Sequence, residues 1–210
     1  MVEDNNEDIF EEMLRYVGLD EQDRASLKSL FPLSESALDE LLTRFYFRVD
    51  LHRGAREIFT DPEVQRPRLG KTLVGWVTST FSGPYDQEYA RRRENIGRVH
   101  VKHLLPQRYM VSAMNIVRSW ATELCFQLSD AEPEEIFRAV RAVNRILDVD
   151  LVLMLSTYQE ALLARMQRQN RLGRIGVVSA GVHPALRNSL GSIALLAAAL
   201  KERPAVSADP

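Results

Sequence analysis

Four histidines are the remaining candidates for chemistry at a functional site: His52, His100, His103 and His183. Other kinds of site lack the residues that they need. The single Cys125 excludes a cysteine-based metal centre. No glycine-rich phosphate loop stands between a strand and a helix, and no Ser-His-Asp neighbourhood presents itself. The sequence therefore gives little support to a hydrolase or a nucleotide-binding protein, and we predict no catalytic residue.

His100 stands in the middle of the apolar face of a predicted helix. Ile96 lies four residues before it and Leu104 four residues after it, and residues at this spacing share one side of a helix. A neutral imidazole in this setting is either a buried core histidine or a ligand of haem iron held against the apolar macrocycle. Taken alone, the pattern favours a core or surface histidine. His103 follows Lys102 and is predicted to face solvent.

The phenol of Tyr46 lies on the apolar stripe of another predicted helix. Its neighbours are Phe45 and Phe47, and the stripe consists of Leu38, Leu41, Leu42, Phe45 and Val49. By itself this pattern indicates a core tyrosine whose hydroxyl needs one hydrogen-bond partner.

The segments that carry these residues repeat their apolar side chains at helical spacing, and none alternates convincingly over the length of a strand. We therefore predict an all-α fold. Ser34 or Ser36 is a plausible cap for the helix that carries Tyr46, and Pro62 and Pro67 are expected to interrupt the chain after it. The other predicted helices cover roughly 7–16, 21–30, 85–105, 107–128 and 134–170, with apolar spacing also over 69–81.

Composition bounds the size and the location of the protein. A chain of 210 residues with 45% hydrophobic content can form one core and leave a tail. The net charge of −2 gives no indication of nucleic acid or an anionic membrane as partner. The acidic N-terminus does not resemble a signal peptide, no apolar run approaches the ~20 residues of a membrane span, and one cysteine fits a reducing compartment. We expect a soluble cytoplasmic protein.

The last long helix contains DVDLVLMLSTY, which is apolar over almost its whole circumference. Such a helix must be covered on two sides. One side can close the core of its own domain, and the other then forms a homodimer contact. Alternatively, the helix is central in a monomer.

Several of these segments together resemble a known family. FYFRVD, REIFTDPE, the stretch through Leu69 and Thr72, IGRVHVKHLLPQRYM and DVDLVLMLSTYQ are similar to the sensor globin of bacterial globin-coupled sensors. The resemblance covers roughly residues 5–165, and the string IG-x-x-H-x-x-H-x-L-P-x-x-Y is its most specific part. It implies a sensor-type globin fold over residues 1–168, followed by a helical linker and dimerisation segment over 169–210.

The resemblance also implies a cofactor and roles for four residues. The cofactor is haem b, His100 matches the proximal ligand of its iron, and Tyr46 matches the distal tyrosine. Leu69 and Thr72 fall on distal positions that line the gas pocket. A tyrosine hydroxyl there donates a hydrogen bond to O2 and favours it over the less polar CO.

The tail segment RIGVVSAGVHPALRNSLGSI resembles the first helix of a histidine-kinase dimerisation domain. In the usual pattern, His-Glu-(Leu or Ile)-Arg-Asn-Pro-Leu, the histidine accepts the phosphoryl group. Here Pro184 occupies the acceptor position, Ala185 replaces the acidic neighbour, and His183 lies one residue early. A proline cannot be phosphorylated, so the departure indicates a degenerate helix that dimerises without kinase activity. A local shift that turns His183 into place is the alternative.

Three functions follow from this interpretation. The first is a haem-based sensor of O2, another diatomic gas or redox state, which signals through changed helix packing in a homodimer. The second is the sensor part of a globin-coupled histidine kinase, phosphorylated on His183 and acting with a kinase or response-regulator partner. The third is a helical scaffold in which Tyr46 and His100 are core residues.

Overall fold

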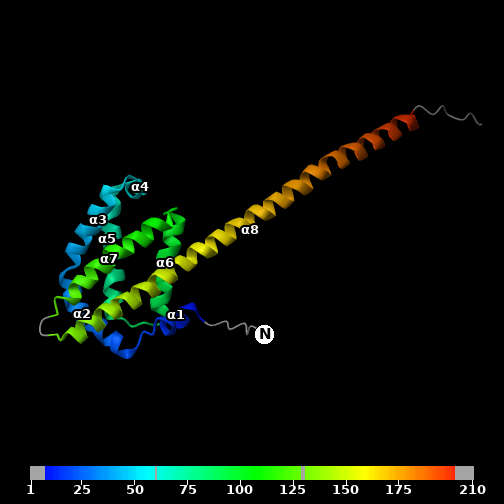
Figure 1. Cartoon of the computed structure of the whole chain (residues 1–210). Coiled ribbons are helices and arrows are strands. Elements are labelled where there is room, and N and C mark those ends of the chain that lie inside the picture. Colours follow the sequence, from blue (N-terminus) through cyan, green and yellow to red (C-terminus); the bar gives the residue numbers. More distant parts are fainter. Residues whose placement is uncertain (1–7, 60, 129–130, 202–210) are drawn as a thin grey trace, which may run out of the picture. The chain divides into compact units, whose positions relative to one another are not determined.

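The computed structural model describes residues 8–59, 61–128 and 131–201, with side chains up to residue 169. Every regular element in these ranges is a helix (Figure 1), which confirms the predicted all-α class. The chain divides into two compact units, Met1–Ala161 and Leu162–Pro210. The helices are α1 (Ile9–Val17), α2 (Glu21–Ser36), α3 (Leu38–Leu51), α4 (Arg53–Arg56), α5 (Pro62–Ser82), α6 (Gln87–Lys102), α7 (Gln107–Cys125) and α8 (Pro133–Lys201).

Local capping groups fix where the first helices begin and end. The carboxylate of Asp8 accepts a hydrogen bond from the backbone N–H of Phe10 at the start of α1. Gly18 ends α1 with φ 69°, a left-handed conformation that glycine adopts without steric cost. Asp20 and Asp23 form a reciprocal capping box at the start of α2.

The start of α3 differs from the predicted one. We expected Ser34 or Ser36 to cap this helix, but α3 begins at Leu38 and its cap, Ala37, makes no side-chain hydrogen bond. Both serines lie within the last turn of α2, where their hydroxyls donate to carbonyl groups of the same helix. A serine hydroxyl can satisfy either end of a helix, so residue type alone could not decide the boundary.

The prediction that Pro62 and Pro67 interrupt the chain is wrong, because both prolines belong to α5. Pro62 occupies the first turn, where a backbone N–H would have no helical partner. Pro67 removes one hydrogen bond to the carbonyl of Glu63, and this position is exposed to water. The carboxylate of Asp61 caps α5 by accepting a hydrogen bond from the N–H of Val64, so the helix begins directly at Pro62.

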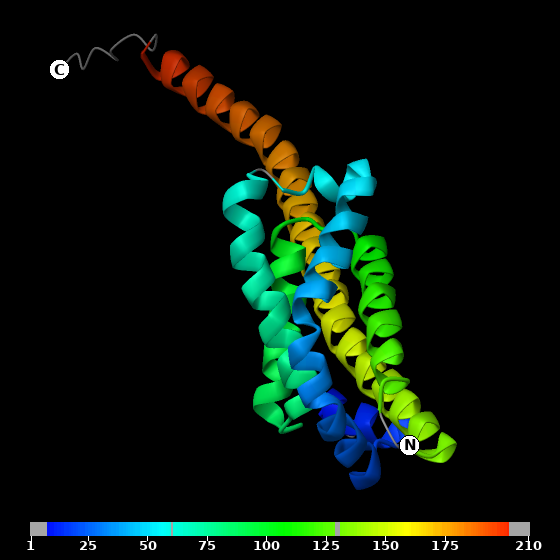
Figure 2. The same ribbon diagram turned by 90° about the vertical axis from the view of Figure 1, so that its left-hand side faces the viewer.

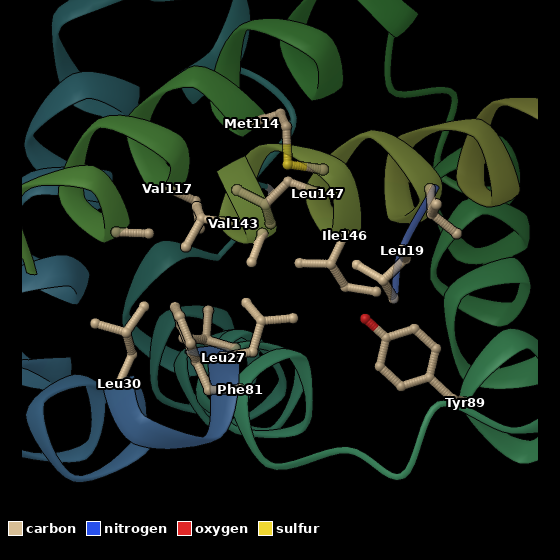
Figure 3. Packing of buried hydrophobic residues seen from close by; sticks show 14 of the residues in the cluster. Leu19, Leu27, Leu30, Phe81, Tyr89, Met114, Val117, Val143, Ile146 and Leu147 are labelled. Carbon is tan, nitrogen blue, oxygen red and sulfur yellow. The ribbon is translucent and has the colours of Figure 1, made fainter. Parts of the chain in front are cut away.

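The hydrophobic core of the first unit takes side chains from α1, α2, α3, α5, α6, α7 and α8 (Figure 3). Its fully buried side chains lie where the apolar stripes of these helices meet, and burial of each contributes roughly 1.5–3 kcal/mol. The largest are Trp120, Tyr89, Phe10, Leu27, Leu30, Leu41, Leu124, Ile146, Leu147, Leu153 and Val77. This core fixes α8 within the unit, and α3 lies between α5 and α7 on another side (Figure 2).

The backbone of α8 continues as helix to Lys201, through the glycines at 173, 176 and 181 and through Pro184. The predicted boundary at 168/169 therefore falls inside a helix, whereas the two compact units divide after Ala161. The side chain of His183, the predicted alternative phosphoacceptor, lies outside the described residues. In the part of the chain that the structure describes, no helix is both long and apolar enough to cross a membrane.

Candidate functional site

One face of α6 carries the candidate ligand together with two residues that fix the helix. Asp86 caps the first turn by accepting a hydrogen bond from the N–H of Tyr89 at 2.9 Å. Arg93, Gly97 and His100 then follow at spacings of four and three residues, which place them on the same side of the helix. Contacts of Arg93 and Gly97 show that this side faces α8.

Arg93 anchors α6 through a fully buried ion pair with Asp150 of α8. Nε of Arg93 lies 3.1 Å from a carboxylate oxygen of Asp150, and both side chains are at most 1% exposed. The same carboxylate accepts hydrogen bonds from the indole of Trp76 and the hydroxyl of Tyr89, both at 2.7 Å. Burial and the Asp150 carboxylate raise the pKa of Tyr89 well above its ordinary value, so its hydroxyl stays a donor. The charge of Asp150 is thus fully compensated.

The remaining donors of the Arg93 guanidinium bind α5. They reach the hydroxyls of Ser79 and Thr80 at 2.8 and 2.9 Å, and the carbonyl oxygen of Trp76 at 3.2 Å. The cluster of Arg93, Asp150 and these partners therefore ties α5, α6 and α8 together at one level of the domain.

Gly97 brings the backbone of α6 directly onto α8. A Cβ atom at this position would lie 2.2 Å from the hydroxyl of Thr157 and 2.4 Å from the carbonyl oxygen of Met154. Only a residue without a side chain fits so close an approach. Beyond the helix end, the Tyr158 hydroxyl donates to the carbonyl of Leu105 at 2.9 Å. The position of α6 on α8 is therefore fixed on both sides of His100.

His100 is largely buried and its Nδ1 has no hydrogen-bond partner among the described residues. Burial, with a smaller contribution from the charge of His103, lowers the pKa of His100 to about 4. The imidazole is consequently neutral at physiological pH. His103 is exposed, as predicted.

Leu104 ends α6 in a strained conformation. Its φ is 55°, and the N–H groups of Leu104 and Leu105 donate to the carbonyls of Val101 and His100 at 3.0 Å each. This pattern is a Schellman motif, in which the left-handed residue is usually glycine.

Because a leucine at this φ is strained by roughly 1 kcal/mol, and its side chain is 79% exposed, we expect Leu104→Gly to stabilise the fold. The expected gain in the free energy of unfolding is about 0.5–1 kcal/mol, measured by urea denaturation. Leu104→Ala loses the same side chain but keeps the strain, so it should give no gain. A glycine variant no more stable than the alanine variant would contradict the assignment of strain.

Tyr46 lines a pocket of about 610 Å³ between α3 and α5. Its hydroxyl donates to the carbonyl oxygen of Arg66 at 3.0 Å. A Cβ atom at Gly70 would lie 3.8 Å from the Tyr46 hydroxyl, an ordinary van der Waals distance, so α5 packs beside Tyr46 at this point. Burial raises the pKa of Tyr46 although the nearby Arg66 charge opposes this, so the hydroxyl is protonated at neutral pH. Other residues on the pocket wall include Leu42, Thr43, Pro67, Lys71 and Val74.

The predicted site residues occupy different surroundings. Tyr46 lies on the pocket wall, whereas His100 lies on α6 and is not among the residues of α3 and α5 that line this pocket. Leu69 is 38% exposed on α5. Thr72 is exposed and its hydroxyl donates to the carbonyl of Arg68 at 3.3 Å. The proposed roles of all four residues remain predictions.

Sequence reasoning missed the residues that fix α6. Asp150 carried a signal, because a carboxylate inside the apolar run DVDLVLMLSTY needs a buried partner. Arg93 stood in a charged stretch, RRREN, where nothing separated it from the exposed arginines beside it. Gly97 gave no sign of its contact, since a close approach depends on the partner helix.

Comparison with known proteins identifies the class. The sequence profile named Protoglobin matches residues 6–164. The heme-based aerotactic transducer HemAT of Halobacterium salinarum is 31% identical over 87 residues, which are 41% of this chain and 18% of that protein. This chain thus spans less than a fifth of the length of that relative. The chain belongs to the protoglobin family.

Solved structures agree with this assignment. The globin domain of the Geobacter sulfurreducens globin-coupled sensor superposes with a TM-score of 0.65 at 30% identity, over 70% of this chain and 96% of that domain. The ferric globin domain of E. coli DosC gives a TM-score of 0.60 over 70% of this chain and 98% of that domain, at 16% identity, which shows the shared fold alone. These matches confirm the resemblance to sensor globins and the predicted globin fold.

Proposed function

We propose that this chain binds haem b and acts as a gas sensor, with His100 as the protein ligand of the iron. The observation that carries the proposal is the state of His100, which is half-buried and neutral and whose buried Nδ1 has no partner among the described residues. The relatives support the cofactor, since one is named as a heme-based transducer and another as the globin domain of a globin-coupled sensor.

The residues present fit this cofactor. A buried polar nitrogen without a partner indicates a partner that the chain itself does not supply. A neutral imidazole is the form that coordinates haem iron, and a low pKa keeps protons from competing for it. Arg93 and Gly97 hold the helix that presents this imidazole.

Haem, when bound, would supply an iron atom able to take a diatomic gas. We assign Tyr46 as the hydrogen-bond donor to that gas, because its hydroxyl is protonated and it matches the distal tyrosine of the sensor globins that the sequence resembles. A hydrogen bond from this hydroxyl stabilises a polar ligand such as O2 more than CO. Leu69 and Thr72 are assigned to the same side by their resemblance to family positions.

We further propose that the protein works in the cytoplasm as a homodimer, joined through α8 and the tail. Within the globin unit, Val149 and Leu153 of α8 are buried, while Leu151, Val152 and Leu155 remain half-exposed. An apolar helix with a half-exposed second face favours contact with another copy. The signal would then pass as changed helix packing to a kinase or response-regulator partner.

The visible spectrum of the haem-reconstituted chain tests this function. We expect His100→Ala to lose or strongly alter the Soret band, because it removes the iron ligand. His103→Ala is the matched control, since it removes an exposed histidine three residues away. Tyr46→Phe should keep the band and release O2 about tenfold faster, as expected for the loss of one hydrogen bond.

Two results would count against the proposal. If the wild-type chain binds no haem, the proposal fails and the protein is better described as a helical scaffold. A spectrum that is the same in His100→Ala and His103→Ala assigns the iron to another ligand.

A further inference from the structure

Two charged residues, Arg66 and Asp50, lie beside Tyr46. A tyrosine does not need such a pair in order to donate a hydrogen bond to a gas. The Arg66 guanidinium forms an ion pair with Asp50, which follows Tyr46 by one turn of α3. The same guanidinium lies 5.5 Å from the centre of the Tyr46 ring, while the Arg66 carbonyl accepts the Tyr46 hydroxyl at 3.0 Å. Arg66 therefore contacts Tyr46 through both its side chain and its backbone.

Asp50 keeps the Arg66 guanidinium in this place. Nε of Arg66 is buried without a hydrogen-bond partner among the described residues, so the guanidinium is incompletely satisfied where it lies. The ion pair with Asp50 supplies the charged contact, and it spans α3 and the N-terminal part of α5. The segment of α5 that accepts the Tyr46 hydroxyl is thereby tied to α3.

The hydrogen bond from the Tyr46 hydroxyl to the Arg66 carbonyl competes with ligand binding. A tyrosine hydroxyl has one proton to donate. While it donates to the Arg66 carbonyl, it cannot donate to a gas ligand beside it. The strength of the Asp50–Arg66 ion pair, which links α3 to α5, therefore decides how readily the Tyr46 hydroxyl can donate to the ligand instead.

We propose that Asp50 and Arg66 are positioning residues that weaken gas retention by holding the Tyr46 hydroxyl on the Arg66 carbonyl. This inference rests on the proposed gas-binding function. When the ion pair opens, this part of α5 is held less firmly, and the hydroxyl can turn away from the Arg66 carbonyl and donate to the ligand. The ion pair is 31% and 42% exposed on its two sides, so its effect is limited to that of a partly exposed pair.

The test is Asp50→Asn in the full chain reconstituted with haem, with O2 and CO release measured in both the Tyr46 and the Tyr46→Phe background. We expect O2 release to slow by about two- to fivefold in the Tyr46 background. CO release should change less than O2 release, because CO is the less polar ligand, and Asp50→Asn should have no effect once Tyr46 is phenylalanine. Arg66→Gln opens the pair from its other side and should act in the same direction.

Infrared spectroscopy reports whether the Tyr46 hydroxyl donates to the Arg66 carbonyl or to the ligand, and it does not depend on ligand release. In the CO complex, a hydrogen-bond donor beside the ligand lowers the infrared C–O stretching frequency. We expect Asp50→Asn to enlarge the lower-frequency band, and Tyr46→Phe to abolish that increase. Glu57→Gln is the control, because it opens an exposed ion pair with Arg53 and should leave both readouts at the wild-type value.

The outcomes separate this inference from the function on which it rests. If the wild-type chain shows no haem spectrum, the proposed function fails and the inference fails with it. If the spectrum depends on His100 but Asp50→Asn releases O2 at the wild-type rate, the inference alone is overturned. An effect of equal size in the Tyr46→Phe background also overturns it, because Asp50 would then act independently of Tyr46.

Discussion

Asp150→Asn is expected to lower the free energy of unfolding by about 3–5 kcal/mol, because it leaves the Arg93 guanidinium buried without its counter-charge. Both partners are at most 1% exposed, so water cannot replace the lost carboxylate. The amide of asparagine also cannot accept all the hydrogen bonds that Trp76, Tyr89 and Arg93 donate. Urea denaturation followed by circular dichroism measures the loss.

Asp148→Asn is the matched control, two residues earlier in the same helix. Its carboxylate pairs with Arg118 and is 56% exposed, so its loss should cost less than about 1 kcal/mol. Removing the unpaired charge as well, as Arg93→Met with Asp150→Asn, should recover part of the stability lost in Asp150→Asn, because the asparagine oxygen still accepts a hydrogen bond. Equal unfolding midpoints for Asp150→Asn and Asp148→Asn would show that the buried pair does not anchor the domain.

The second large effect is expected at Gly97. The added methyl group of Gly97→Ala would overlap the Met154 carbonyl oxygen, 2.4 Å away, and the Thr157 hydroxyl, 2.2 Å away. A carbonyl of the α8 backbone cannot move aside as a flexible side chain can, so α6 must shift. We expect a loss of about 3 kcal/mol or more, measured by thermal or urea unfolding.

The same glycine-to-alanine change at Gly75 is expected to raise the free energy of unfolding instead of lowering it. Gly75 lies in the middle of α5, and a Cβ there would meet no atom within 4 Å. Alanine should therefore stabilise the fold by about 0.5–1 kcal/mol, because it is the better helix former. If Gly97→Ala proves as harmless as Gly75→Ala, α6 does not lie against the α8 backbone as described.

The substitution at Gly97 is also expected to affect the candidate haem ligand His100. Since Gly97 and His100 share one face of α6, a shift of the helix at Gly97 moves the imidazole as well. The Soret band of Gly97→Ala, compared with that of Gly75→Ala, should therefore change along with stability.

The helices and two site candidates could be predicted from the sequence, because each depends on information local in the chain. Apolar spacing gave the all-α fold, and the IG-x-x-H-x-x-H-x-L-P-x-x-Y string directed attention to His100. Helix ends were less certain. Ser34 and Ser36 were expected to start one helix and instead end another, because a hydroxyl can bond at either terminus.

Tertiary structure alone decided which residues support the site. Arg93 meets Asp150 across 57 residues of sequence, and Arg66 meets Asp50 only because α5 packs beside α3. Neither pairing has a periodic signature, since an arginine in a charged helix looks the same whether it is exposed or buried. The sequence by itself determined the helices and the chemistry they carry. The packing of distant segments decided which charges are buried, where α6 lies on α8, and what holds the Tyr46 hydroxyl.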